Sequence, residues 1–331
     1  MPPPFKGEME LIEKAIKDFE EGKRRNTAVI SDPFYGESEL LEWVWERAGG
    51  GALKVKAGSL KEEFEILERS SAKIAIVEEA HRLYLRKIGG FDLMDRFINF
   101  VSSSSERLFI TTWNSFSWKY LDEVLGIGQH FPMKIELPGM DAGKIRDMLL
   151  SGYEEGELNF VEEEKDETEE PKILKRSSFK ISLLGERIEI PRPEVDLNSI
   201  RSRFHKVEEK RPPMEIFFGK LARISDGNPG VAELLWKEAL DYPKVRDCLV
   251  DLPSIDLDLD DSFALNVILS MGSVDLADLS EVLEPVGTSA ERAAALLEER
   301  GLVFIDGEVV SLRAEALKRT AEHLRRARLV W

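Results

Sequence analysis

The sequence of 331 residues predicts an α/β protein with a five-stranded parallel sheet, a charged insertion, a small helical region and a C-terminal domain of three helices and a β-ribbon. Short apolar runs alternate with helical patterns over residues 5–150, as in a doubly wound parallel sheet with helices on both faces. After residue 254, three helical patterns precede two apolar runs joined by Asp306-Gly307, a dipeptide typical of hairpin turns.

The elements of the first region follow from their hydrophobic periodicity. Apolar residues at helical spacing predict helices, and continuous apolar runs predict strands that are buried on both faces. The expected strands are Thr27–Ser31, Leu53–Ala57, Lys73–Val77, Arg107–Thr111 and Met133–Leu137. The expected helices are 7–22, Ser38–Arg47, Leu60–Arg69, Phe91–Val101 and Trp118–Leu125.

The region after residue 150 is divided by its composition. Positions 154–170 carry ten acidic residues and one lysine, whereas positions 172–211 carry eleven basic and six acidic residues. Two apolar runs, Phe179–Leu183 and Arg187–Ile190, flank a glycine-containing turn and predict a hairpin. The expected domains are a core over 1–150, a charged insertion over 151–212, a helical lid over 213–253 and a winged-helix domain over 254–331.

The helices and strands of the last two regions follow from the same patterns. The turn Asp226–Gly230 separates two lid helices, Met214–Ser225 and Val231–Leu240. The winged-helix pattern consists of helices Ser262–Met271, Leu276–Leu283 and Ser289–Arg300, strands Leu302–Ile305 and Val309–Leu312, and a final helix Arg313–Arg328.

Composition excludes several classes of protein. No run of 18 apolar residues exists, so no membrane-spanning helix is expected, and the N-terminus has no apolar signal-peptide core, so we expect a cytoplasmic protein. The net charge of −17 disfavours a surface that wraps nucleic acid. One cysteine, Cys248, excludes a disulfide framework. A single glutamine, Gln129, among many ionic residues indicates a thermophilic, archaeal-like origin.

The segment after the first predicted strand has the form of a phosphate-binding loop. On the pattern G-x-x-x-x-G-K-[ST], Gly36 matches the second glycine and Ser38 matches the hydroxyl that binds Mg²⁺. Glu37 stands where the lysine belongs, so a carboxylate replaces the positive charge that holds the β- and γ-phosphates. Pro33 also removes one backbone N–H from the loop.

Polar residues follow the third and fourth predicted strands. Glu78 and Glu79 come directly after four apolar residues, as in a Walker B motif, where the first acid holds Mg²⁺ and the second orients the attacking water. Their alternative role is to favour the dipole at a helix start. At the end of the fourth strand, Asn114 or Thr112 is either a sensor of the γ-phosphate or part of a turn or helix cap. Glu79 and Asn114 are thus the catalytic candidates, if the protein is active.

These positions together resemble the AAA+ superfamily of P-loop ATPases and its relatives, the signal-transducing (STAND) ATPases. The order of loop, Walker B strand, sensor strand, lid and winged helix is similar. The segment Phe5-Lys-Gly7 resembles the N-terminal box near the adenine, and Asn228-Pro229-Gly230 resembles the lid turn whose proline contacts the base. The resemblance implies ATP or ADP with Mg²⁺, bound by Gly36, Glu37, Ser38, Glu78 and Pro229, with Ser38 and Glu78 as metal ligands.

The departures from this pattern all weaken the nucleotide site. A lysine has become Glu37, an aspartate has become Glu78, and neither Gly230 nor Val231 supplies the arginine with which initiator-type relatives sense the γ-phosphate. The sequence therefore favours a degenerate AAA+/STAND-like homologue, a pseudo-ATPase with weak or absent nucleotide binding. Its expected role is that of a regulatory or scaffold subunit for a protein partner.

Two alternatives stay open at this point. The first is an active ATPase with an atypical P-loop. The second is an initiator-like DNA-binding protein that acts through the basic insertion or the C-terminal helix, for which the candidate residues are Arg201, Arg203, Lys206, Arg325 and Arg326. The expected DNA-reading helix, Ser289–Arg300, carries three acids against two bases and lacks Asn, Gln and Lys, which favours protein packing instead.

Overall fold

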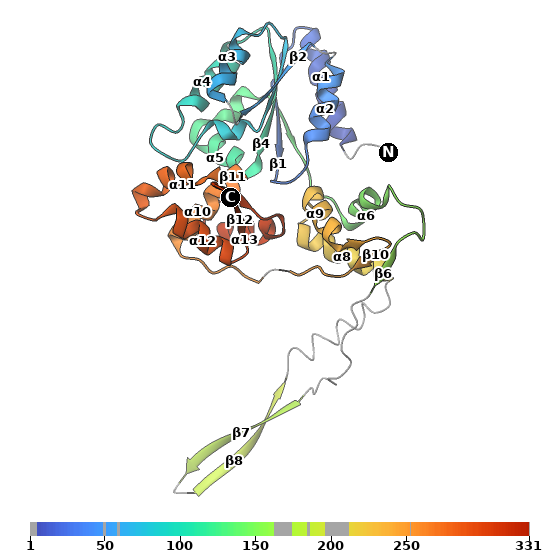
Figure 1. Cartoon of the computed structure of the whole chain (residues 1–331), viewed down its shortest axis with the longest axis vertical. Helices are drawn as coiled ribbons and strands as arrows, with labels where there is room; N and C mark the ends of the chain where they lie inside the picture. The colour runs from blue at the N-terminus through green and yellow to red at the C-terminus, as the bar shows by residue number, and fades with distance from the viewer. Residues whose placement is uncertain are drawn as a thin grey trace.

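A five-stranded parallel sheet forms the core of the molecule. The computed structural model describes residues 5–48, 51–57, 60–161, 174–183, 186–195, 212–251 and 253–330. The strands lie in the order β2-β3-β4-β1-β5, and every pairing is parallel, so their carboxyl ends share one edge (Figure 1). The predicted α/β fold class is confirmed. The strands are β1 Thr27–Ser31, β2 Ala52–Lys56, β3 Ile74–Glu78, β4 Leu108–Asn114 and β5 Met133–Glu136.

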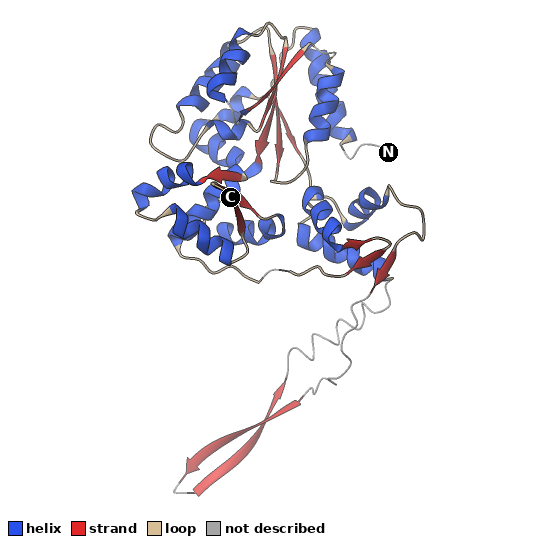
Figure 2. Ribbon diagram, in the orientation of Figure 1, coloured by secondary structure: helices blue, strands red, loops and turns tan. Residues whose placement is uncertain are grey.

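Helices cover both faces of this sheet because successive strand residues point to opposite sides. In β1, Val29 packs in a cluster with α1 and α2, whereas Ala28 and Ile30 pack in a second cluster with the other helices. Figure 2 shows the helices in blue on either side of the red strands. One face carries α1 Lys6–Glu20 and α2 Ser38–Arg47, and the other carries α3 Leu60–Arg69, α4 Asp92–Ser103 and α5 Ser115–Leu125.

The lid contains one helix that the sequence patterns do not predict. Helix α6 (Ala142–Leu150) begins at Asp141, whose carboxylate accepts the Lys144 N–H at 2.9 Å as an N-cap. Its Ile145 and Leu149 are buried in the same cluster as the other lid helices, so we propose a lid that begins at α6 rather than at residue 213. The other lid elements are α8 Pro213–Ser225, α9 Pro229–Ala239, β6 Asn159–Val161, β9 Leu240–Asp241 and β10 Lys244–Arg246.

The C-terminal region contains the four helices and two strands that the sequence predicts, and its described residues include one further strand. The extra strand β11 pairs with β13, and β13 pairs with β12, so the three form an antiparallel sheet. Lid and C-terminal region share one hydrophobic cluster. The elements are α10 Leu259–Met271, β11 Ser273–Asp275, α11 Leu276–Leu283, α12 Ala290–Glu299, β12 Val303–Asp306, β13 Val309–Leu312 and α13 Leu317–Arg326.

The predicted hairpin is confirmed, with longer strands than expected. Strands β7 (Leu174–Leu183) and β8 (Glu186–Val195) pair antiparallel along their whole length. They form a two-stranded sheet that extends away from the lid in Figure 1. The charged segments around them, including most of 154–170, lie outside the described residues.

The lid helix α9 lies directly on the loop that follows β1. Asn228 caps α9 by accepting the Val231 N–H at 3.1 Å, and its side-chain N–H donates to the Pro33 carbonyl at 2.8 Å. A Cβ atom added to Gly230 would lie 1.6 Å from the Phe34 carbonyl oxygen. Only glycine therefore permits this approach of helix to loop.

Gly230→Ala should lower the free energy of unfolding by about 1–3 kcal/mol, because the new methyl group overlaps backbone that must move. The matched control is Gly219→Ala, in the interior of α8, where an added Cβ meets nothing within 4 Å. There the better helix propensity of alanine should raise stability by about 0.5–1 kcal/mol. Urea unfolding of both variants is the measurement. Equal effects of the two substitutions would contradict the contact.

Candidate nucleotide site at the carboxyl edge of the sheet

The loop between β1 and α2 has the strand–loop–helix form of a phosphate cradle. Gly36 has a φ of +84°, which suits glycine, and Phe34 has a φ of +68°, which is uncommon for a large side chain. Ser38 begins α2 and is exposed. Glu37 precedes it as the N-cap residue, yet its side chain makes no capping hydrogen bond. The two matched cradle residues are thus in the predicted place.

Aromatic residues of the loop fill the space beside it. Tyr35 is buried, its hydroxyl donates to the Pro138 carbonyl at 2.6 Å, and its ring lies 6.1 Å from that of Phe5. Burial raises the pKa of Tyr35 to about 12, so the hydroxyl stays a donor at physiological pH. Phe34 packs against the cluster of the lid, where Pro229 is buried. The resemblance places the segment at Phe5 and the lid turn at Pro229 near an adenine. Here both segments pack against side chains of the protein itself.

Glu37 brings a carboxylate into a half-buried position at this edge. Burial is the main cause that raises its pKa, and the charges of Glu79 and Glu78 raise it further, while hydrogen bonds from its own backbone and from Ser31 act in the opposite direction. Glu78 ends β3, Glu79 follows it and Glu37 precedes α2, so three carboxylates lie at the end of the sheet where the parallel strands end. Glu37 therefore brings no positive charge to the place where the loop pattern has a lysine.

Both acids after β3 are held by basic side chains. Glu78 lies 2.9 Å from the Lys54 ammonium, and Glu79 lies 2.9 Å from the Arg82 guanidinium and 3.5 Å from the Lys56 ammonium. Glu79 has a φ of +52°, and its N–H donates to the Thr112 hydroxyl at 2.9 Å. These ion pairs neutralise the two groups that a Walker B motif would offer to metal and water.

Sequence reasoning missed all three basic partners. Lys54 and Lys56 lie on β2, which pairs with β3 so that Lys56 is opposite Glu78. The alternation Lys-x-Lys in a strand next to the Walker-type strand could have identified them. Arg82 lies in the short 3-10 helix Ala80–Leu83, and nothing in the sequence places it against Glu79.

The side chain of Asn114 bonds two other elements of the protein. Its side-chain oxygen accepts the N–H groups of Phe116 at 2.9 Å and Ser117 at 3.4 Å, which caps α5. Its side-chain nitrogen donates to the Leu269 carbonyl of α10 at 2.8 Å. The sensor candidate thus lies at the predicted edge, but it joins α5 to the C-terminal region. The capping role, which the sequence left as the alternative, is present.

His81 lies beside Asn114 as a buried, neutral imidazole. Its Nδ1 accepts the Asn114 N–H at 3.1 Å. The pKa of His81 is lowered to about 3. Burial is the main cause and the positive charge of Arg82 adds to it, while a hydrogen bond to the backbone of Met271 opposes both. The ring therefore stays uncharged at physiological pH.

A pocket of about 530 Å³ lies at the carboxyl ends of β1 and β5, against α5. Its lining includes Ser31 but neither Gly36 nor Ser38, so it does not coincide with the cradle. Four acids and one lysine are among its lining residues, which are Ile30, Ser31, Asp32, Ser115, Trp118, Lys119, Asp122, Glu123, Glu136 and Leu137.

The residues at this edge do not fit a magnesium–triphosphate group. A half-buried carboxylate occupies the lysine position, the two Walker-type acids are paired with cations, and the lid lies on the loop backbone. Within the described residues, no group of three or more His, Cys, Asp or Glu side chains is arranged to hold a metal ion.

The candidate nucleic-acid-binding residues belong to two parts of the chain, of which only α13 is described. The Arg326 guanidinium donates to the Glu322 carbonyl at 3.3 Å, and that of Arg325 lies 5.9 Å from the Phe116 ring centroid. Arg201, Arg203 and Lys206 lie outside the described residues.

In the part of the chain that the structure describes, no helix is long and apolar enough to cross a membrane.

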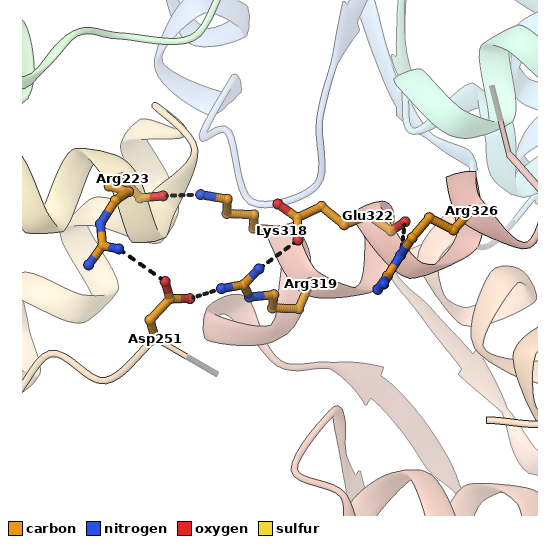
Figure 3. Close-up of polar contacts among 6 residues, drawn as sticks. All are labelled: Arg223, Asp251, Lys318, Arg319, Glu322 and Arg326. Atoms are coloured by element: carbon orange, nitrogen blue, oxygen red, sulfur yellow. Dashed lines mark hydrogen bonds and ion pairs between the residues drawn. The ribbon is translucent and has the colours of Figure 1, made fainter. Parts of the chain in front are cut away.

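Other basic residues of α13 contact the lid (Figure 3). The Lys318 ammonium donates to the Arg223 carbonyl at 2.6 Å, next to the C-terminal end of α8. The Arg319 guanidinium lies 2.7 Å from Asp251 and 2.8 Å from Glu322. Part of the positive charge on α13 is thus used to hold the helix against the lid and the segment that follows it.

No family model matches the sequence, and no curated protein matches it. Similar solved structures include a single-residue variant of Thermotoga maritima RuvB, with 11% identity, a TM-score of 0.42 and coverage of 94% of this chain and 93% of that one. Cdc6p from Pyrobaculum aerophilum has 12% identity, a TM-score of 0.41 and coverage of 99% and 95%. The Aeropyrum pernix ORC2 protein has 11% identity, a TM-score of 0.39 and coverage of 99% and 95%. At these scores the fold class rests on the strand order and helix arrangement described above.

His81→Gln should flatten the pH dependence of stability between pH 7 and pH 5. The unfolded imidazole takes up a proton below its ordinary pKa of 6.5, whereas the folded one does so only near 3, so stability falls as the pH falls through this window. The contribution at pH 5 is about 2 kcal/mol. Urea unfolding at pH 7, 6 and 5 measures it. His130→Gln, which removes an imidazole bonded to Ser102 instead, is the control. If the stabilities of wild type and His81→Gln fell by the same amount between pH 7 and pH 5, the lowered pKa of His81 would be refuted.

Proposed function

We propose that this chain is an AAA+/STAND-like protein whose nucleotide site is degenerate, and that it acts as a regulatory or scaffold subunit bound to a protein partner. The observation that carries the proposal is that Glu37 takes the place of the loop lysine while Lys54 and Arg82 hold Glu78 and Glu79 in ion pairs. Glu37 supplies no positive charge to a triphosphate, and the two paired acids would have to leave their cations before they could serve Mg²⁺ or water.

The contact between lid and loop supports the same function. Asn228 and Gly230 bring α9 onto the backbone of Pro33 and Phe34. A bound base or sugar would have to separate these groups and expose the hydrogen bond to water. The closed arrangement is thus maintained by protein contacts and does not require a ligand.

The charge distribution favours a protein partner over nucleic acid. The exposed face of α12 presents Glu291, Glu298 and Glu299, and its Arg292 is bound to Asp261 at 3.2 Å. Duplex binding rests on exposed basic side chains that release counterions. A helix with this composition is suited to a mixed-charge protein surface.

Mg-ATP or Mg-ADP at millimolar concentration should leave the melting temperature of the wild-type protein unchanged. A ligand that binds the folded state at 100 times its Kd would stabilise it by about 2.7 kcal/mol, which thermal unfolding detects readily. The variant Glu37→Lys should be measured alongside the wild type, because it restores the positive charge that the loop pattern has at this position. A clear rise for wild type, or ATP turnover that Glu79→Gln abolishes, would refute the degenerate site.

The chain purified from its own cells should elute together with a second polypeptide. Because no nucleotide is needed to hold the closed form, the complex should persist in EDTA and should not change with added Mg-ATP. Size-exclusion chromatography with mass analysis of the peak is the measurement. Elution only at the 37.6 kDa of the single chain, or release of the partner by Mg-ATP, would contradict the role.

A further inference from the structure

The C-terminal end of α10 lies against the carboxyl edge of the sheet. The last four carbonyls of any α-helix lack partners within the helix, and a buried carbonyl without a donor is costly. In α10, three consecutive residues receive hydrogen bonds from side chains of the core domain. Asn114 Nδ2 donates to the Leu269 carbonyl at 2.8 Å, Ser117 Oγ donates to the Ser270 carbonyl at 2.6 Å, and the His81 ring bonds the backbone of Met271.

We propose that Asn114, Ser117 and His81 form a C-terminal cap in trans for α10, and that this cap fixes the C-terminal domain to the sheet in one position that does not depend on nucleotide. All three side chains are buried. The imidazole Nδ1 already accepts the Asn114 N–H, so Nε2–H is the group that donates to α10.

Arg82 adds a charged contact to the same helix end. Its guanidinium donates to the Ser273 hydroxyl at 2.8 Å and to the Ser273 carbonyl at 3.3 Å. A cation at this end complements the negative pole of the α10 dipole. The same guanidinium is 2.9 Å from Glu79. The side chain that neutralises the second Walker-type acid therefore also holds the start of β11.

Apolar side chains interlock across the same boundary. Met271 of α10 is buried in the cluster on the α3–α5 face of the sheet, and Phe116 of α5 is buried in the cluster of lid and C-terminal domain. The hydrogen bonds of the cap are thus shielded from water on both sides, and separation of the domains would break them and expose both apolar side chains to water.

The substitution Asn114→Asp tests the cap without removing α5. An aspartate keeps the oxygen that accepts the Phe116 and Ser117 N–H groups, but it replaces the donor to Leu269 with an acceptor. The matched control is Asn266→Asp, because Asn266 donates to the Leu329 carbonyl within the C-terminal domain at 3.3 Å. Ser117→Ala, which removes one donor only, is the milder second variant.

Spin labels on two exposed helix positions, Glu10 of α1 and Ala295 of α12, report the position of the C-terminal domain by pulsed electron resonance in a Cys248→Ser background. The wild-type distance distribution should be narrow and unchanged by millimolar Mg-ATP. Asn114→Asp should broaden it at least twofold and Ser117→Ala should broaden it less, while Asn266→Asp leaves it narrow.

Two results would overturn the inference. One is a narrow, unshifted distribution in folded Asn114→Asp, or, if that variant does not fold, in Ser117→Ala. The other is a wild-type distribution that shifts with Mg-ATP, because the position of the domain would then depend on nucleotide.

Discussion

The need to satisfy the carbonyl groups at the end of α10 shapes the carboxyl edge of the sheet. Asn114 meets that need with its amide nitrogen and caps α5 with its amide oxygen. One side chain therefore sets the start of α5 and the position of the C-terminal domain together. His81 and Ser117 complete the set from two other elements. Its oxygen and one of its amide N–H groups are committed to α5 and α10, so the side chain could not turn towards a phosphate or its attacking water without breaking both contacts.

At the same edge, the acids that follow β3 take part in structural ion pairs. Glu78 and Glu79 keep their strand-end positions, but Lys54 and Arg82 neutralise them. Removing either cation would leave a half-buried carboxylate beside the carboxylate of Glu37. Each ion pair thus lowers a repulsion that the sequence itself introduced. Arg82 then extends the network to the C-terminal domain through Ser273.

The fold was largely predictable because burial leaves a periodic pattern. Strand β1 and helix α3 begin and end at the predicted residues, since each has continuous or helical apolar spacing. Helix α6 and strand β11 were missed, because they bury only two side chains and one side chain, which leaves no distinctive periodicity. The candidate site was predictable to the extent that parallel strands end together. The partners of its residues were not, because the Leu269 carbonyl is 155 positions from Asn114.

The close approach of α9 to the loop after β1 has an evolutionary consequence. Gly230 lies near the start of the lid helix, where the resemblance to initiator-type proteins would place a sensing arginine. Even a methyl group there overlaps the Phe34 carbonyl. A single substitution cannot place a larger side chain here, because the loop after β1 would have to be rebuilt first. Packing between helix and loop therefore keeps position 230 a glycine.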